Sequence, residues 1–234
     1  MQTTQSFRLS ILLALPVLAF FNMGAEGGCA NAEDSEDVAA DRLYAQHWLY
    51  YNAKSDKTDV RAAFRFGNEL GTIVQLNPPA KVSFGTTPLG FDPNWGWHHT
   101  EVAGVADNGT IVYVDKEGKE SRVPTGTLGR IAFANTPIAL DRTASATLAW
   151  QGAALEQGEN VELFVSSTSN AANFVTFGTS AAGATSVVLT PDLLSRLPPG
   201  PIALAFKRHK VTRPDAKTKV SLSYESLNAS GDLR

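Results

Sequence analysis

Apolar and polar side chains alternate along most of the chain beyond residue 40, and turn residues interrupt the alternation about every ten residues. In Val60–Phe66, for example, arginines alternate with apolar side chains. A period of two is that of a β-strand whose two faces meet different surroundings, whereas an amphipathic helix has a period of about 3.6. The alternation therefore predicts an all-β protein built from antiparallel strands.

Two antiparallel β domains are predicted, over residues 41–135 and 136–230. The first begins with a hairpin over residues 48–66. The second contains about seven strand candidates within roughly 100 residues, the number expected of one β-sandwich. The first domain is expected to end in a meander of three strands, Glu101–Ala106, Thr110–Asp115 and Lys119–Val123.

The second domain carries a loose family pattern. Leu148–Gly152 contains Trp150 and leads through a turn into a strand of alternating apolar residues, and Leu197-Pro-Pro-Gly200 directly precedes another such strand. Over residues 136–224 this arrangement resembles immunoglobulin-like and fibronectin-type modules of secreted bacterial proteins. The resemblance implies an immunoglobulin-like β-sandwich. It transfers no catalytic or binding residue, because sandwich modules host many unrelated functions.

The N-terminus has the pattern of a secretory signal peptide, which we assign to residues 1–28. Arg8 is the only charge among the first ten residues, and Ile11–Phe21 follows without a polar side chain. A transmembrane helix needs about 20 apolar residues, and this run is shorter and contains Pro16. The pattern predicts an exported protein.

The position of the single cysteine bears on whether the exported chain is anchored by lipid or soluble. Cys29 follows Gly27-Gly28, which resembles the lipobox of bacterial lipoproteins, although Glu26 stands where that motif usually has an apolar residue. We predict lipidation at Cys29 and a lipid anchor at the bacterial cell envelope, facing the periplasm or on the cell surface. The alternative is cleavage after Ala30-Asn31-Ala32, which would give a soluble secreted or periplasmic chain.

The charge distribution excludes some partners. The 20 basic and 23 acidic residues give a net charge of −3, so no overall field would attract nucleic acid, and none is expected as a partner. Residues 29–40 contain four carboxylates and no basic residue, and they are predicted to form a solvated acidic tether. The basic run Lys207–Lys210 is interpreted as an edge strand kept soluble by its charge.

Enzyme signatures are missing from the sequence. It has no Gly-x-Ser-x-Gly elbow, no His-Glu-x-x-His, no Ser-x-x-Lys and no cysteine pair. No catalytic residue and no cofactor is therefore predicted. Adjacent His98 and His99 suggest a metal site, but neighbouring side chains of a strand point to opposite faces, so no metal ligands are assigned.

The same segment has a second interpretation as a binding surface. Trp95 and Trp97 are two residues apart and would share one face of an extended strand, forming a flat apolar surface on which a sugar ring can stack. His99 would add a polar group beside them. The residues assigned to ligand binding are therefore Trp95, Trp97 and His99, and the alternative is that both tryptophans close the end of a core.

These observations predict an exported cell-envelope lipoprotein that acts as a non-catalytic structural or interaction module with a protein or glycan partner. Two alternatives stay open: a carbohydrate-binding module that uses Trp95 and Trp97, and a small metal-dependent hydrolase centred on His98 and His99. The oligomeric state is not predicted.

Overall fold

The structure is a computed structural model that describes residues 32–234. The predicted signal peptide of residues 1–28 and the predicted lipidation site Cys29 lie outside these residues. The all-β fold class is confirmed, since 54% of the described residues lie in strands and 3% in helices. The strands form sheets of 12, four and three strands. The two short helices are η1 (Ala40–Arg42) and α1 (Pro191–Leu194).

The 12-stranded sheet runs through the whole described chain, and we call it the long sheet. Eight of its strands form one continuous path. In spatial order they are β1 (Glu33–Asp34), β4 (Thr72–Gln75), β3 (Lys57–Phe66), β2 (Leu43–Asn52), β18 (Thr218–Glu225), β17 (Gly200–Thr212), β14 (Glu159–Ser167) and β15 (Phe174–Thr179).

Four further strands attach to this path. The hairpin of β7 (Gly90–Asp92) and β8 (Trp97–Ala103) joins β3 beside β4, and the parallel pair β19 (Ala229–Leu233) and β12 (Ile138–Leu140) joins β17. The long sheet therefore has branches at both ends.

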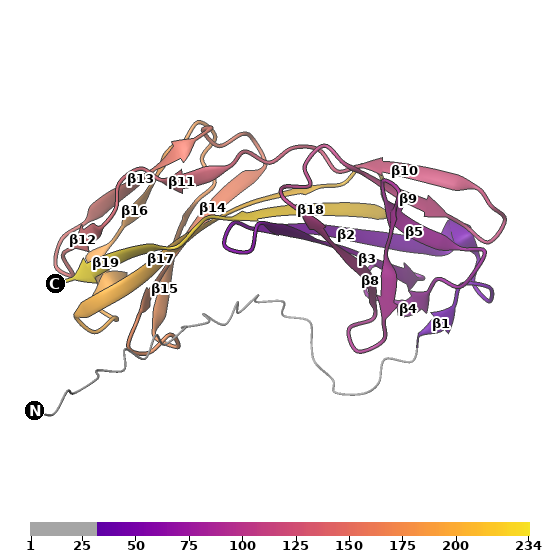
Figure 1. Cartoon of the computed structure of the whole chain (residues 1–234), viewed down its shortest axis with the longest axis horizontal. Coiled ribbons are helices and arrows are strands. Elements are labelled where there is room, and N and C mark those ends of the chain that lie inside the picture. Colours follow the sequence, from indigo (N-terminus) through magenta and orange to yellow (C-terminus); the bar gives the residue numbers. More distant parts are fainter. Residues whose placement is uncertain (1–31) are drawn as a thin grey trace, which may run out of the picture.

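Two smaller sheets cover one face of the long sheet. Figure 1 shows an arch, with β5, β9 and β10 along its outer side at one end and β11, β13 and β16 at the other. The four-stranded sheet consists of β10 (Glu120–Pro124), β9 (Thr110–Val114), β5 (Lys81–Phe84) and β6 (Thr87–Pro88). The three-stranded sheet consists of β11 (Ile131–Phe133), β13 (Ala146–Gly152) and β16 (Ser186–Leu189).

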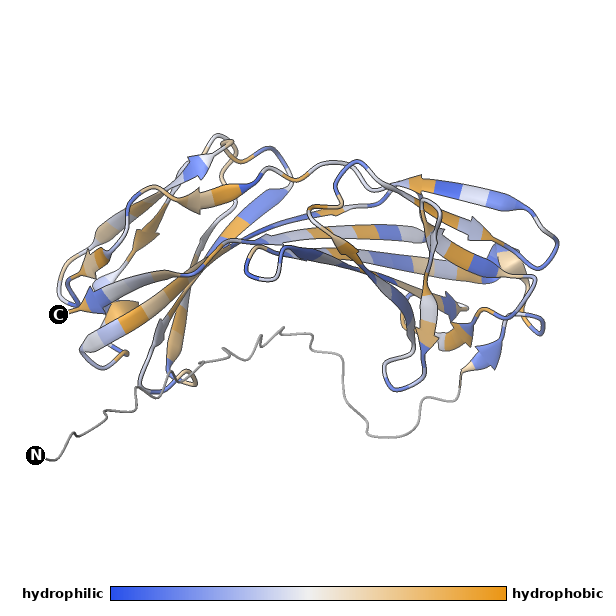
Figure 2. Cartoon of the chain, in the orientation of Figure 1, coloured by the Kyte–Doolittle hydropathy of each residue, from blue (hydrophilic) through white to orange (hydrophobic). Residues whose placement is uncertain are grey.

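The core lies between the long sheet and these two covers. Hydrophobic and hydrophilic residues alternate along the long strands (Figure 2), and Leu49, Val60 and Leu222 of these strands belong to the buried core. Phe64 of β3 packs on Tyr113 of one cover, with ring centroids 5.0 Å apart. Phe206 of β17 packs on Phe133 of the other cover, at 4.5 Å.

Strands from the two ends of the chain meet in the middle of the long sheet. β18 pairs with β2 in parallel, in register from Thr218 opposite Ala45 to Glu225 opposite Asn52. This pairing joins residues assigned to the C-terminal domain (136–230) with residues assigned to the N-terminal domain (41–135). The division into two domains stays a prediction, but the sheet is continuous across that boundary.

Some local predictions were wrong. The expected meander is split, because β8 belongs to the long sheet while β9 and β10 form a hairpin in a cover. Part of the expected acidic tether is folded: Glu33–Asp34 pairs in parallel with β4, and Val38 is buried. Lys207–Lys210 lies in β17 between β14 and β18, so it is not an edge strand. Each error concerns long-range pairing, which alternation alone does not specify.

A buried ion pair ties a cover to the long sheet. Arg208 of β17 forms a salt bridge with Glu159 of β14, and both side chains are almost fully buried. The Arg208 guanidinium also donates to the carbonyl oxygens of Ala153 and Ala154, at 2.8 and 2.9 Å, in the loop that follows β13. Burial raises the pKa of Glu159, but hydrogen bonds from Arg208 and from the Glu156 N–H outweigh it, and the net pKa is lowered.

Replacing Arg208 alone should destabilise the fold. Arg208→Met leaves the buried Glu159 carboxylate with Lys210, 3.4 Å away, as its one cationic neighbour among the described residues, beside the hydrogen bond from the Glu156 N–H. Loss of a buried ion-pair partner typically costs about 3–5 kcal/mol. The double variant Arg208→Met/Glu159→Leu should recover most of the lost free energy of unfolding, because neither charge of the buried pair remains. Urea unfolding measures both variants, and a single variant within about 1 kcal/mol of the wild type would contradict the assignment.

Candidate functional site

The face of the long sheet opposite the covers is not covered by any described residue, and we call it the open face. It lines the inner side of the arch (Figure 1). Strand register places side chains from neighbouring strands side by side: Arg61 of β3 lies next to Trp48 of β2, and Asp59 lies next to Tyr50. On the other side of β3, Arg61 also lies next to His99 of β8.

Three tryptophans gather at one end of the open face, and we call them the tryptophan stack: Trp48, Trp95 and Trp97. The rings of Trp95 and Trp97 are nearly parallel, with an interplanar angle of 5° and centroids 5.3 Å apart. Trp48 lies against Trp97 with centroids 6.5 Å apart. Trp95 is the outermost ring and is 64% exposed. A large indole that stays this exposed while stacked on a second indole is a preformed apolar surface.

The β7–β8 turn brings the two rings together. Asp92 accepts a hydrogen bond from the Asn94 N–H through its side chain, and its carbonyl accepts one from the Gly96 N–H. Gly96 has φ +68°, and an added Cβ would lie 2.5 Å from Ile73 Cδ1. Glycine is therefore required there, and the turn folds Trp95 back over Trp97.

An ion pair supports the stack from the neighbouring strand. Arg61 Nε donates to Asp59 Oδ2 at 2.7 Å, and a second guanidinium nitrogen binds the same oxygen. The Arg61 guanidinium carbon lies 4.5 Å from the centroid of the Trp97 ring, at cation–π distance. Asp59 thus orients Arg61, and Arg61 packs on Trp97.

The two adjacent histidines lie on opposite faces of β8. His99 is exposed on the open face, with Nε2 4.0 Å from Asp92 Oδ2. His98 is buried on the covered face, where its Nε2 accepts a hydrogen bond from the Leu76 N–H. Within residues 32–234, no three His, Cys, Asp or Glu side chains are grouped so that they could hold a metal ion.

The structure thus places Trp95, Trp97 and His99, which the sequence nominates, in one region of the open face. Their arrangement differs from a flat pair on one strand, because Trp95 lies in a turn and stacks on Trp97. The sequence did not predict Trp48, Arg61 or the role of Asp59 in this region. Their only sequence signal is their alternation within two strands, and cross-strand neighbours depend on register.

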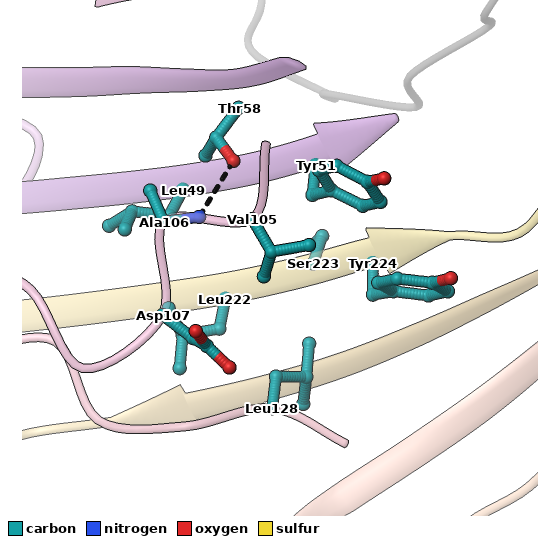
Figure 3. A pocket seen from close by; sticks show the side chains of 10 residues that line it. All are labelled: Leu49, Tyr51, Thr58, Val105, Ala106, Asp107, Leu128, Leu222, Ser223 and Tyr224. Atoms are coloured by element: carbon teal, nitrogen blue, oxygen red, sulfur yellow. Dashed lines mark hydrogen bonds between the residues drawn. The ribbon is translucent and has the colours of Figure 1, made fainter. Parts of the chain in front are cut away.

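A small pocket on the covered face offers little room for a ligand. It lies between the two covers, and Figure 3 shows Tyr51 and Tyr224 side by side at one end and the Thr58 hydroxyl bonded to the Ala106 N–H at the other. Its volume of about 20 Å³ accommodates roughly one water molecule. The pocket therefore does not compete with the open face as a ligand site.

In the described part of the chain, no helix has the length and apolar character needed to cross a bilayer.

Comparisons with known proteins give no family. No protein-family model matches the sequence, and no curated protein matches it. Among solved structures, the chain is similar to one described as "Structural insight into host cell surface retention of a 1.5-MDa bacterial ice-binding adhesin", with 13% identity, a TM-score of 0.29, and coverage of 82% of this chain and 66% of that one.

A second solved structure is described as "Crystal structure of tetra-tandem repeat in extending region of large adhesion protein". Its identity to this chain is 13% and its TM-score 0.30, over 81% of this chain and 49% of that one. The chain thus spans less than two thirds of either structure. At these TM-scores we draw nothing from the likeness.

Two buried histidines should make the fold acid-sensitive. Burial lowers the pKa of His47 from 6.5 to about 4, against an opposing effect of Asp215, and burial lowers that of His98 to about 4. The unfolded chain binds protons below pH 6.5 while the folded chain does not. The free energy of unfolding should therefore fall between pH 6.5 and 4, by about 1.4 kcal/mol per pH unit for each histidine.

Urea unfolding between pH 7 and 5 measures this slope, in a range where most carboxylates stay ionised. In a His47→Gln/His98→Gln variant the slope should be much smaller, with a remainder from groups such as His209, whose pKa burial also lowers. An unchanged slope in this variant would show that other groups cause the acid sensitivity.

Proposed function

We propose that this protein is a non-catalytic binding module of the bacterial cell envelope, and that its open face binds a glycan through Trp95. The observation that carries the proposal is the exposed Trp95 ring, held parallel to Trp97 at 5.3 Å. The C–H groups of a sugar ring pack on such an indole face, which removes apolar surface from water on both partners.

Polar groups beside the ring support a carbohydrate over a purely apolar ligand. Exposed Asn94 and His99 and half-buried Asp92 belong to the same hairpin as Trp95 and carry hydrogen-bond donors and acceptors. A sugar presents hydroxyl groups around its edge and an apolar face in its middle. An aromatic surface with polar groups at its rim matches this distribution.

A metal-dependent hydrolase receives less support. His98 and His99 point away from each other, so they do not converge on one ion, and His98 is occupied by the Leu76 N–H. The described residues offer no third ligand nearby. Binding without chemistry is therefore the function that we propose.

Export and lipidation are a separate part of the proposal and rest on the sequence. A lipid on Cys29 would hold the folded body at a membrane surface, because each buried CH₂ group of an acyl chain contributes about 0.8 kcal/mol. The folded part begins within a few residues of Cys29, as β1 starts at Glu33. The module would then lie close to the membrane.

Removing the outer ring should weaken glycan binding. Trp95→Ala should weaken affinity at least about tenfold, since an aromatic stack contributes about 0.5–1.5 kcal/mol beyond the area that it buries. Titration of the full chain with soluble oligomers of β-linked glucose and of β-linked N-acetylglucosamine, followed by tryptophan fluorescence and calorimetry, measures this.

Leu227→Ala is the matched control, because Leu227 is 62% exposed and lies in the loop between β18 and β19, whereas the tryptophan stack is formed by β2, β8 and the β7–β8 turn. It should bind as the wild type does. The proposal is wrong if no oligomer binds, or if Trp95→Ala and Leu227→Ala bind with equal affinity.

Intact mass of the protein extracted from membranes tests the anchor. We expect an N-terminus at Cys29 that carries two or three acyl chains, and a Cys29→Ser variant should leave the membrane fraction. A mature chain that begins at Glu33 would instead support the soluble alternative.

A further inference from the structure

A hollow of about 600 Å³ opens on the open face beside the tryptophan stack. This volume falls within the range of sites that hold small molecules, about 300–1,000 Å³. Its walls come from β2, β3, the turn between them and β8. We call it the polar hollow, and the residues that matter most are Asn52, Lys54, Lys57, Asp59, Arg61 and Glu101.

Donors and acceptors share the walls of the polar hollow. Lys57 Nζ donates to Glu101 Oε2 at 2.7 Å, and these side chains are 53% and 57% exposed, so each keeps hydrogen-bonding capacity toward solvent. Lys54 makes no ion pair with any described residue. The turn that carries it is held by Asn52, whose side-chain oxygen accepts the Lys54 and Ser55 N–H groups. Mixed charged donors and acceptors of this kind suit a ligand with many hydroxyl groups.

Arg61 connects the polar hollow to the tryptophan stack. It lines the hollow and at the same time lies 4.5 Å from the Trp97 ring, which is itself 5.3 Å from Trp95. The Trp97 ring therefore separates the exposed face of Trp95 from the hollow. A single sugar ring on Trp95 cannot fill the hollow as well, whereas a chain of several sugars can contact both.

A peptide is a poorer match for this surface. β3 is an internal strand, paired with β2 on one side and with β4 and β8 on the other, so its backbone groups are not available to an added strand. A ligand can therefore contact only side chains here. The side chains that line the polar hollow are mostly polar or charged, so the hollow provides no deep apolar pocket for an anchoring side chain of a peptide.

We infer that the polar hollow is a second subsite for the same ligand, and that the ligand is an oligosaccharide or polysaccharide chain of several sugars. One sugar stacks on Trp95, and the hydroxyl groups of the sugars that follow accept hydrogen bonds from Lys57 and donate hydrogen bonds to Glu101 in the hollow. This inference rests on the proposed function of the tryptophan stack.

The dependence of affinity on chain length tests the inference. The full chain is titrated by calorimetry with β-linked glucose and β-linked N-acetylglucosamine oligomers, from monomer to hexamer. For the type that binds, the wild type should gain about tenfold or more in affinity between the monomer and the hexamer. Lys57→Gln/Glu101→Gln should lose most of this gain and keep its affinity for the monomer within about twofold.

A second variant distinguishes loss of the subsite from a general loss of local structure. Lys57→Glu/Glu101→Lys keeps the ion pair and the net charge but exchanges donor and acceptor, and it should lose the length dependence as well. The matched control is Glu120→Gln/Arg122→Gln, which removes an exposed ion pair of β10 in a cover and should retain the full gain. Thermal unfolding should be similar in all variants, because exposed pairs contribute little stability.

The outcomes separate the two proposals. If both hollow variants keep the length dependence of the wild type, or if the wild type binds monomer and hexamer equally, the second subsite is wrong while binding at Trp95 stands. If the wild type binds no oligomer, the proposed function fails and the subsite fails with it.

Discussion

The parallel pairing of β18 with β2 is the constraint on which the rest of the structure depends. It joins the two ends of the described chain into one long sheet, with eight consecutive residue pairs between the strands. These strands lie at the centre of the sheet's strand order, and the two covers lie on the same face, one at each end (Figure 1). Neither cover lies on the opposite face among residues 32–234 (Figure 1), and the candidate site lies there.

The two faces of the long sheet have different surroundings. The covered face buries its apolar side chains between sheets, and its few charged groups are compensated, as Arg208 is by Glu159 and two backbone carbonyls. The open face meets solvent, and its aromatic residues are held by neighbours across the strands. Tyr50, for example, donates to Glu225 of β18, and Lys207 of β17 lies 5.7 Å from the Tyr50 ring. Such contacts fix the side chains before any ligand arrives.

The sequence predicted the local elements and missed their long-range arrangement. Alternation correctly predicted the β2–β3 hairpin, and the Trp95-x-Trp97 spacing led to a binding surface being predicted in that segment, which stays a prediction. Alternation could not show that β8 pairs in the long sheet and not with the β9–β10 hairpin. It also could not show that Lys207–Lys210 lies inside the long sheet, because strand order is decided by contacts between distant residues. For the same reason Arg61 and Trp48 emerged only from register. Trp95 stacks on Trp97 through the turn at Gly96, and the alternation of residues does not predict the positive φ of this glycine.

The central claim is that the open face of the long sheet is the ligand surface of this protein. Hydroxyl-radical footprinting of the full chain, with and without β-linked oligosaccharides, tests it most directly by reporting side-chain accessibility over the whole molecule. We expect protection of Trp95 and of Tyr50, which lines the polar hollow, while exposed residues of the covers such as Val188 keep their reactivity. Protection confined to the covers, with Trp95 as reactive as before, would contradict it.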